Sequence, residues 1–378
     1  MKLCPVCYAP CDRGDYSSRG LRLLSSKLDY LQSFPFDRQE ALQLAVDQKV
    51  KMSISGVQPK LGAQLSLKNR CFEITQKGGS YILKPDNPHF PHVPANEAAT
   101  MHIAGLAGMA KPLSGMIYDR NRQLIYFVKR FDRVGKGKRA VEDFGQLLGL
   151  SRAKKYDASM EDLARVVKEY ASFPALELPR LYALVLLNFL LGNEDGHVKN
   201  FSMITDAEGV VRLSPVYDLV NTTILAAGNA PVMEETALPL HGRKKGLTRL
   251  DFEEYLGREV MGLTLKAVSS IGRNLEQALM RGANFIHAES FLSAEMKLKY
   301  LFVMGMRRLR LGFHAPLPDG EFVGYLYPEE KDRLCFARLE TRGMNLVFSP
   351  VPEMEKYQDK LVKITVSSGE TRIVLHSD

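Results

Sequence analysis

The stretch LLGNEDGHVKNFSMI, residues 190–204, places a dense polar cluster directly after an apolar run. The apolar run, PRLYALVLLNFLLG, is hydrophobic nearly all round and predicts a buried helix. Glycine, serine and proline would suffice for a connecting turn, so the polar cluster favours a functional loop. Its members that could carry chemistry are Asn193, Asp195, His197, Lys199 and Asn200.

The spacing within this loop indicates phosphoryl transfer. Asp195 can accept a proton from an attacking hydroxyl, and Asn200, five residues later, can bind a divalent metal ion, which is the Asp-x4-Asn spacing of kinase catalytic loops. After a predicted strand–turn–strand, SPVYDLVN offers Asp218 as a second metal ligand. Mg²⁺ bound to ATP phosphates prefers such carboxylate and amide oxygens.

Two upstream residues complete a nucleotide-binding set. Lys84 ends the predicted strand SYILK, where its ammonium can hold phosphates. Glu97 lies on the predicted helix NEAATMHIAGLAG, residues 96–108, and can pair with Lys84. Alone, Lys84 could be a solvated strand end and Glu97 a carboxylate at a helix start. Alone, Asp195 could be a turn residue and His197 a structural histidine. The order of the whole set favours the functional interpretation.

The loop SISGVQPKL, residues 53–61, precedes the alternating run GAQLSL. A connecting turn rich in small residues is one interpretation of it. The other is a loop that holds phosphate, in which Gly56 lets the backbone approach and Lys60 adds positive charge.

Composition restricts the class of protein. The chain has 378 residues and a net charge of +8, which favours anionic partners such as nucleotides, nucleic acid or an RNA-bound protein. The charge is spread along the chain, so direct nucleic-acid binding is not favoured. No apolar run approaches the roughly 20 residues that span a bilayer. The start, MKLCPVCYAP, does not resemble a signal peptide, so we expect a cytoplasmic protein.

Five cysteines, an odd count, do not fit a disulfide framework. Cys4, Cys7 and Cys11 in CPVCYAPC could form part of a zinc site with His89, His92 or a partner chain. No second C-x-x-C follows, so the favoured alternative is a small hairpin without metal.

The hydrophobic patterns predict an α+β protein with four segments. Residues 1–50 hold the cysteine turn and the helical stretches LRLLSSKLDYLQSF and DRQEALQLAVDQ, the second capped by Asp37. Residues 51–130 predict an ATP-binding lobe whose antiparallel sheet contains AQLSL, RCFEIT, SYILK and LIYFVK. Residues 131–310 predict a helical catalytic lobe that includes LDFEEYLGREV and a helix over 294–310. Residues 311–378 predict a small β-rich accessory module made of EFVGYLY, DRLCFARLE, NLVFSP, KLVKITVS and TRIVLH.

The chain resembles the HipA-like serine/threonine kinases, the toxins of bacterial toxin–antitoxin systems. The resemblance covers roughly residues 50–310 and is carried by SISGVQPKL, YILKP, the NE helix, FVKRFDR, EDFGQLLG, GNEDGHVKNFS and LSPVYDLVN. The cysteine turn and the SIS loop are most similar to the short HipT-type kinases. The resemblance implies a two-lobed protein-kinase-like fold, ATP and Mg²⁺ as cofactors, and an aminoacyl-tRNA synthetase as the class of protein substrate. It also implies an antitoxin partner, DNA bound only through that antitoxin, and no membrane association.

The resemblance assigns roles to individual residues. It makes Asp195 the catalytic base in a loop lined by His197 and Lys199. The magnesium ligands would be Asn200 and Asp218. The nucleotide would be bound by Ser55, Gly56, Val57, Gln58, Lys84 with its partner Glu97, and the backbone of Lys129 and Phe131. The family has another residue where Lys129 stands, so only a backbone role is implied there.

The resemblance also implies that Ser53 and Ser55 are autophosphorylated and that the modified loop leaves the ATP site. A phosphoserine adds a charge of about −1.5 to −2, which would repel the phosphates of ATP. The alternative is that both serines only supply small side chains and hydroxyls. Residues 311–378 depart from the family pattern. By the resemblance, the separate amino-terminal subdomain of longer HipA proteins has no counterpart here, and residues 311–378 could stand in for it or for an antitoxin-like partner.

Two other functions are weighed against a kinase toxin. A kinase-fold, DNA-associated regulatory protein with little catalysis would not need Lys84, Asp195, Asn200 and Asp218 together. A small-molecule phosphotransferase uses a similar fold and Asp-x4-Asn chemistry, but the SISGVQPK loop argues against it.

Overall fold

The computed structural model describes residues 2–51, 59–75, 78–87, 90, 92–135, 137–225 and 234–312. For residues 46–51 and for five strands between residues 320 and 375 it describes the backbone alone. In this described part of the chain, no helix is long and apolar enough to cross a membrane.

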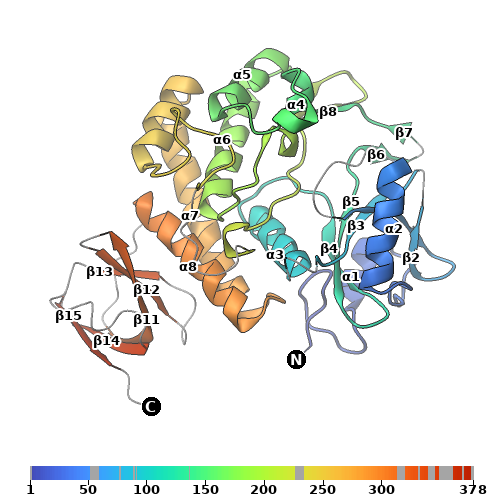
Figure 1. The fold of residues 1–378 in the computed structure, drawn as a ribbon, viewed down its shortest axis with the longest axis horizontal. Helices are drawn as coiled ribbons and strands as arrows, with labels where there is room; N and C mark the ends of the chain where they lie inside the picture. The colour runs from blue at the N-terminus through green and yellow to red at the C-terminus, as the bar shows by residue number, and fades with distance from the viewer. Residues whose placement is uncertain are drawn as a thin grey trace.

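The first lobe is built on an antiparallel sheet with the order β2-β1-β3-β5-β4 (Figure 1). Its strands are β1 (Leu61–Ser66), β2 (Cys71–Ile74), β3 (Tyr81–Lys84), β4 (Ser114–Tyr118) and β5 (Leu124–Lys129). The register pairs Lys84 with Tyr126, so Lys84 ends a central strand. The alternation of apolar and polar residues predicts every strand of this sheet except β4. Its sequence, SGMIY, begins with two small residues and lacks that alternation.

Two short helices precede this sheet. The prediction of a continuous helix over LRLLSSKLDYLQSF is wrong, because α1 (Ser18–Leu24) ends where Ser25 adopts an extended backbone. The apolar residues beyond that point, including Leu28 and Phe34, are buried in the sheet's core without being helical. The second prediction is confirmed: α2 (Arg38–Lys51) starts at Asp37, whose carboxylate accepts the Glu40 N–H at 3.0 Å.

The helix α3 (Val93–Leu106) begins three residues before the predicted start and packs against β4, β5 and α7. It is buried on nearly all sides; Ala99 and Ile103, for example, are fully buried. Glu97 lies in its second turn. The helix therefore carries a carboxylate into the region where the first lobe meets the helical lobe (Figure 1).

The second lobe is mainly helical. It contains α4 (Phe144–Leu147), α5 (Met160–Tyr170), α6 (Pro174–Leu190), the π-helix η4 (Asp251–Val260), α7 (Leu265–Ala288) and α8 (Ala294–Arg310). The apolar run is the buried helix α6, as predicted, and Leu181, Leu187 and Phe189 have no exposed surface. A three-stranded sheet with the order β10-β9-β8 lies beside α6, formed by β8 (Val141–Asp143), β9 (Ser202–Thr205) and β10 (Val211–Leu213).

Shorter elements complete the description up to α8. They are the hairpin of β6 (Arg133–Val134) and β7 (Gly137–Lys138) and the 3-10 helices η1 (Arg152–Lys154), η2 (Val198–Asn200) and η3 (Thr223–Leu225).

The C-terminal strands form a separate antiparallel sheet with the order β13-β12-β11-β14-β15. Its strands are β11 (Gly320–Glu330), β12 (Arg333–Arg338), β13 (Asn345–Phe348), β14 (Leu361–Ser367) and β15 (Glu370–Leu375). All five were predicted from alternation, and β12 and β13 lie beside α8 (Figure 1). The chain is thus an α+β protein with two lobes and a small β module, as expected.

Candidate active site

The polar loop after α6 is shaped by a glycine and an amide network. Gly192 has φ +68°, and a Cβ there would lie 2.7 Å from the Val303 side chain, so glycine is required by both conformation and space. The Asn193 side-chain amide donates to Asn188 Oδ1 at 2.8 Å, and Asn193 Oδ1 accepts the Asp195 N–H at 3.2 Å. The chain then turns into η2 and β9, which places Asp195 and Asn200 at the two ends of one short loop.

A buried arginine of α8 contacts the same loop. Arg307 of α8 is 5% exposed and lies 3.4 Å from Glu194, the neighbour of Asp195. Its guanidinium also lies 3.3 Å from the buried Glu235. Glu194 is held further by the Thr223 hydroxyl at 2.8 Å. The position of this loop therefore depends on α8, and no local motif in the sequence indicates that dependence.

Lys84 connects three distant parts of the sequence. Its ammonium donates to Glu97 Oε1 at 2.5 Å and forms an ion pair with Asp218 Oδ1. Lys60, at the edge of β1, reaches the other Asp218 oxygen, Oδ2, at 3.2 Å. Lys84, Glu97 and Asp218 were predicted to act together, and the fold brings them into direct contact.

Burial and charge set the protonation of this cluster. Lys84 and Glu97 are 4% and 1% exposed, whereas Asp218 is 28% exposed. Burial opposes charge on Asp218, but Lys60 and Lys84 hold the pKa of that carboxyl well below its usual range. Burial raises the pKa of Glu97 above its ordinary value, against the attraction of Lys84. Although burial opposes it, the two carboxylates raise the pKa of Lys84, so the lysine stays charged.

Asn200 and Asp218 have the donor atoms that a magnesium ion needs. The Asn200 side chain donates from Nδ2 to the Asp218 carbonyl at 3.5 Å. Its buried Oδ1 has no hydrogen-bond partner among the described residues. Asp218 has φ +59°, a left-handed conformation that aspartate tolerates better than most residues. An unpaired amide oxygen on a side chain that contacts the backbone of Asp218 fits Mg²⁺, whose other ligands are usually water and phosphate oxygens.

Asp195 is the accessible carboxylate of the loop. Its side chain is 51% exposed, and the Tyr156 hydroxyl donates to its Oδ1. His197 Nε2 lies 4.0 Å from the same oxygen. Burial lowers the pKa of His197, although Asp195 opposes this, so the imidazole is neutral at pH 7. Asp195 can thus receive a proton from a molecule that arrives from solvent.

Three other predicted residues have definite positions. Lys199 forms an ion pair of 2.7 Å with Asp143, which also caps α4, so it is held toward β8. The Lys129 N–H donates to the Leu113 carbonyl at 2.8 Å and is therefore used within the fold. The Phe131 ring lies 5.6 Å from the ring of Tyr217, the neighbour of Asp218.

The glycine-loop predictions cannot be placed. They concern Ser53, Ser55, Gly56, Val57 and Gln58, which lie outside the described residues.

The cysteine turn forms a hairpin in which Leu3 bridges Pro10. Cys4, Cys7 and Cys11 are free thiols, and Cys7 Sγ lies 3.2 Å from the Ser17 hydroxyl. His89 lies outside the described ranges. Within those ranges, no three His, Cys, Asp or Glu side chains are grouped so as to hold a metal ion.

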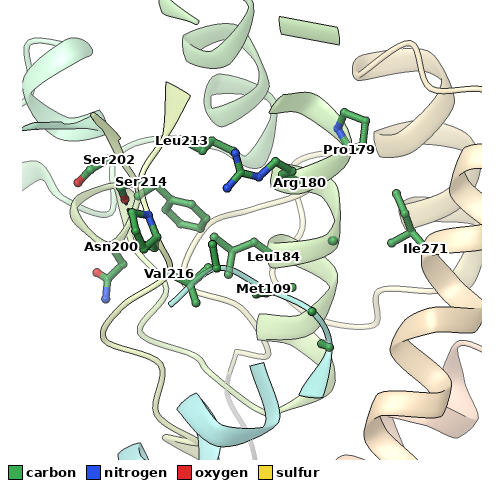
Figure 2. A pocket seen from close by; sticks show the side chains of 16 residues that line it. Met109, Pro179, Arg180, Leu184, Asn200, Ser202, Leu213, Ser214, Val216 and Ile271 are labelled. Carbon is green, nitrogen blue, oxygen red and sulfur yellow. Dashed lines mark hydrogen bonds between the residues drawn. The ribbon is translucent and has the colours of Figure 1, made fainter. Parts of the chain in front are cut away.

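A cavity of about 330 Å³ is lined in part by Asn200 and by residues 213–216. Figure 2 shows Arg180 and Leu184 of α6 on one side and Val216 on the other, with the Asn200 amide pointing away from Leu184. The wall formed by residues 213–216 leads directly to Asp218. The cavity therefore borders Asn200 and the segment that leads to Asp218.

Sequence reasoning missed Tyr156, Lys155, Glu194 and Arg307. Tyr156 lies 39 residues before Asp195 in an exposed stretch, and Arg307 lies 113 residues after Glu194. No local pattern links these pairs, and only the tertiary fold brings them together.

The comparisons with known proteins agree with this geometry. The family model described as the HipA-like C-terminal domain matches residues 52–282, more than half of the chain. The chain belongs to the HipA-like family. The expected HipA-like fold is confirmed by the solved structure of Shewanella oneidensis HipA with HipB and operator DNA. That match has a TM-score of 0.57 at 22% identity and covers 76% of this chain and 74% of the other.

Relatives in sequence carry kinase names. A Haemophilus influenzae protein named a putative kinase is 29% identical over 290 residues, which is 68% of this chain and 80% of the relative. Putative kinase Y4dM of Sinorhizobium fredii is 30% identical over 236 residues, 58% of this chain and 56% of the relative. The serine/threonine-protein kinase toxin HipA of Shewanella oneidensis is 30% identical over 195 residues, 46% of this chain and 44% of the relative. The HipA-like chain thus spans only about half of the last two.

Proposed function

We propose that this HipA-like protein is an ATP- and Mg²⁺-dependent protein serine/threonine kinase. The observation that carries the proposal is the buried Lys84, which contacts both Glu97 and Asp218. A structural ion pair would need one carboxylate, whereas a lysine between two carboxylates, one of them partly exposed, suits a site for nucleotide phosphates and metal. The kinase names of the relatives support the same activity.

The chemistry follows from the positions of the side chains. Lys84 binds phosphate oxygens of ATP, while Asn200 and Asp218 hold Mg²⁺. The metal, when bound, neutralises charge on the phosphates. Asp195 accepts the proton of the serine or threonine hydroxyl. The hydroxyl oxygen bonds to the γ-phosphorus as the bond from that phosphorus to ADP breaks and ADP leaves. Besides Lys84, Lys60 provides a second positive charge next to Asp218.

The biological role that fits best is that of a toxin in a toxin–antitoxin system. The Shewanella relative is named a toxin, and its structure contains HipB and operator DNA. By analogy, this chain would bind an antitoxin protein, contact DNA only through it, and phosphorylate an aminoacyl-tRNA synthetase or another translation component. The β module over residues 320–375 would dock on α8, beside which β12 and β13 lie.

Induced expression of the intact chain in a bacterial host tests the toxin role. Wild type is expected to stop growth, and Asp195→Ala is expected to permit it, because the base is lost while its half-exposed position leaves folding intact. Phosphopeptide mass spectrometry should find a serine of a synthetase or other translation protein modified only with wild type. Unimpeded growth with an active wild-type kinase would refute the toxin role and leave phosphoryl transfer standing.

Autophosphorylation in the SIS loop is expected to limit the activity. The proposal rests on the like-charge repulsion between a phosphoserine and the phosphates of ATP. The double variant Ser53→Ala, Ser55→Ala should keep a constant rate of ATP turnover during a time course in which wild type slows. Progress curves with intact-mass measurement check this. Equal slowing in both proteins would remove the proposed switch.

A further inference from the structure

One oxygen of Asp195 accepts a hydrogen bond and lies near two further nitrogen atoms. The Tyr156 hydroxyl donates to Oδ1, Lys155 Nζ lies 3.9 Å from it, and His197 Nε2 lies 4.0 Å from it. Within the described ranges, no hydrogen bond reaches the other oxygen, Oδ2. The side chain is half-exposed, so the carboxylate has one anchored oxygen and a second that no hydrogen bond of the described residues holds.

The segment that supplies Lys155 and Tyr156 is fixed to the loop that carries Asp195. The Lys155 carbonyl accepts the Val198 N–H at 3.4 Å. The Tyr156 ring meets the His197 ring edge-on with centroids 5.3 Å apart, and Lys155 Nζ lies 4.7 Å from the Tyr156 centroid. Residues 155 and 156 lie between η1 and α5, so the helical lobe sets their position relative to Asp195.

We propose that Tyr156 is a positioning residue that holds the Asp195 carboxylate so that Oδ2 faces the acceptor hydroxyl. This role rests on the proposed kinase function. A carboxylate on a half-exposed side chain rotates freely unless one oxygen is fixed, and a base works only within hydrogen-bond reach of the proton it accepts. Burial, together with Asp195, raises the pKa of Tyr156, so its hydroxyl remains a neutral donor at all working pH values.

A competing role for Tyr156 predicts the opposite change in the rate of phosphoryl transfer. If the Tyr156 hydroxyl occupied the position of the substrate hydroxyl, removing it would speed phosphoryl transfer. The free Oδ2 and the additional contacts to Oδ1 favour positioning. The sign of the rate change decides between the two roles.

The test is Tyr156→Phe in the full chain, which keeps the ring contacts with His197 and Lys155 and removes the hydroxyl. Transfer from γ-labelled ATP with Mg²⁺ to casein and to the chain itself is measured at one fixed pH. We expect kcat to fall about 10- to 100-fold, the effect of losing a hydrogen bond to a charged group, with KM for ATP within about twofold.

Tyr170→Phe is the matched control. Tyr170 lies at the end of α5, where its hydroxyl donates to the Leu147 carbonyl at 3.4 Å and interacts with Glu169. Among the described residues no contact joins it to Asp195, so loss of the hydroxyl should leave kcat unchanged. An active wild type with an unchanged Tyr156→Phe variant would overturn the positioning role while the kinase function stands. A faster variant would overturn it in favour of competition for the acceptor position. A wild type that transfers no phosphate would contradict the proposed function and this role with it.

Discussion

Replacing Asp195 with asparagine is expected to lower kcat for phosphoryl transfer by about 10²- to 10⁴-fold, the usual contribution of a general base. Asparagine has the same shape and can still accept a hydrogen bond from the Tyr156 hydroxyl, but it cannot take a proton from a substrate. Because the side chain is 51% exposed, the free energy of unfolding should change by less than about 0.5 kcal/mol. Steady-state kinetics and urea unfolding measure the two effects.

Asp157→Asn is the matched control for this change. Asp157 is exposed and directly follows Tyr156, and no contact of its carboxylate is recorded among the described residues. Its replacement should leave kcat unchanged. A similar loss in both variants would indicate a general effect of charge near the loop, and full activity of Asp195→Asn would exclude Asp195 as the base.

Replacing Lys84 with methionine should damage both activity and stability. Loss of the phosphate contact is expected to lower kcat/KM by at least about 10²-fold. Glu97, 1% exposed, would lose its hydrogen-bonded cation, and breaking a buried pair in this way costs about 3–5 kcal/mol. Urea unfolding and ADP release report the two losses separately.

The double variant Lys84→Met, Glu97→Gln separates the two effects. It removes the buried charge left by the single change and should recover a large part of the unfolding free energy, while activity stays low. Recovery of activity along with stability would show that Lys84 is a structural residue only. No recovery of stability would contradict the buried pair as the source of the loss.

Much of the site could be predicted because its members lie in short patterns. Lys84 ends a run of alternating apolar and polar residues, and Asp195 and Asn200 share one loop. Spacing alone therefore identified these three residues as candidates. The contacts of Lys84 with Glu97 and Asp218 agree with the expected order of strand, helix, loop and strand. The family resemblance then supplied the roles that chemistry alone left open.

The rest depends on contacts between residues far apart in sequence. Helix α1 stops at Leu24 although the apolar spacing continues, because Leu28 and Phe34 are buried by the sheet and not by a helix face. Tyr156 and Arg307 lie in stretches whose sequences fit ordinary surface and helix positions. Only packing of α8 and of the segment before α5 against the loop gives these side chains their partners.

The central claim is that Lys84, Asp195, Asn200 and Asp218 transfer the γ-phosphoryl group of ATP to a hydroxyl. The most direct measurement is the incorporation of label from γ-labelled ATP, with and without Mg²⁺, by wild type and by Asp218→Asn, because asparagine also tolerates a positive φ. The account predicts label on serine or threonine only with wild type and Mg²⁺. Wild type without any incorporated label, or equal labelling of Asp218→Asn, would contradict it.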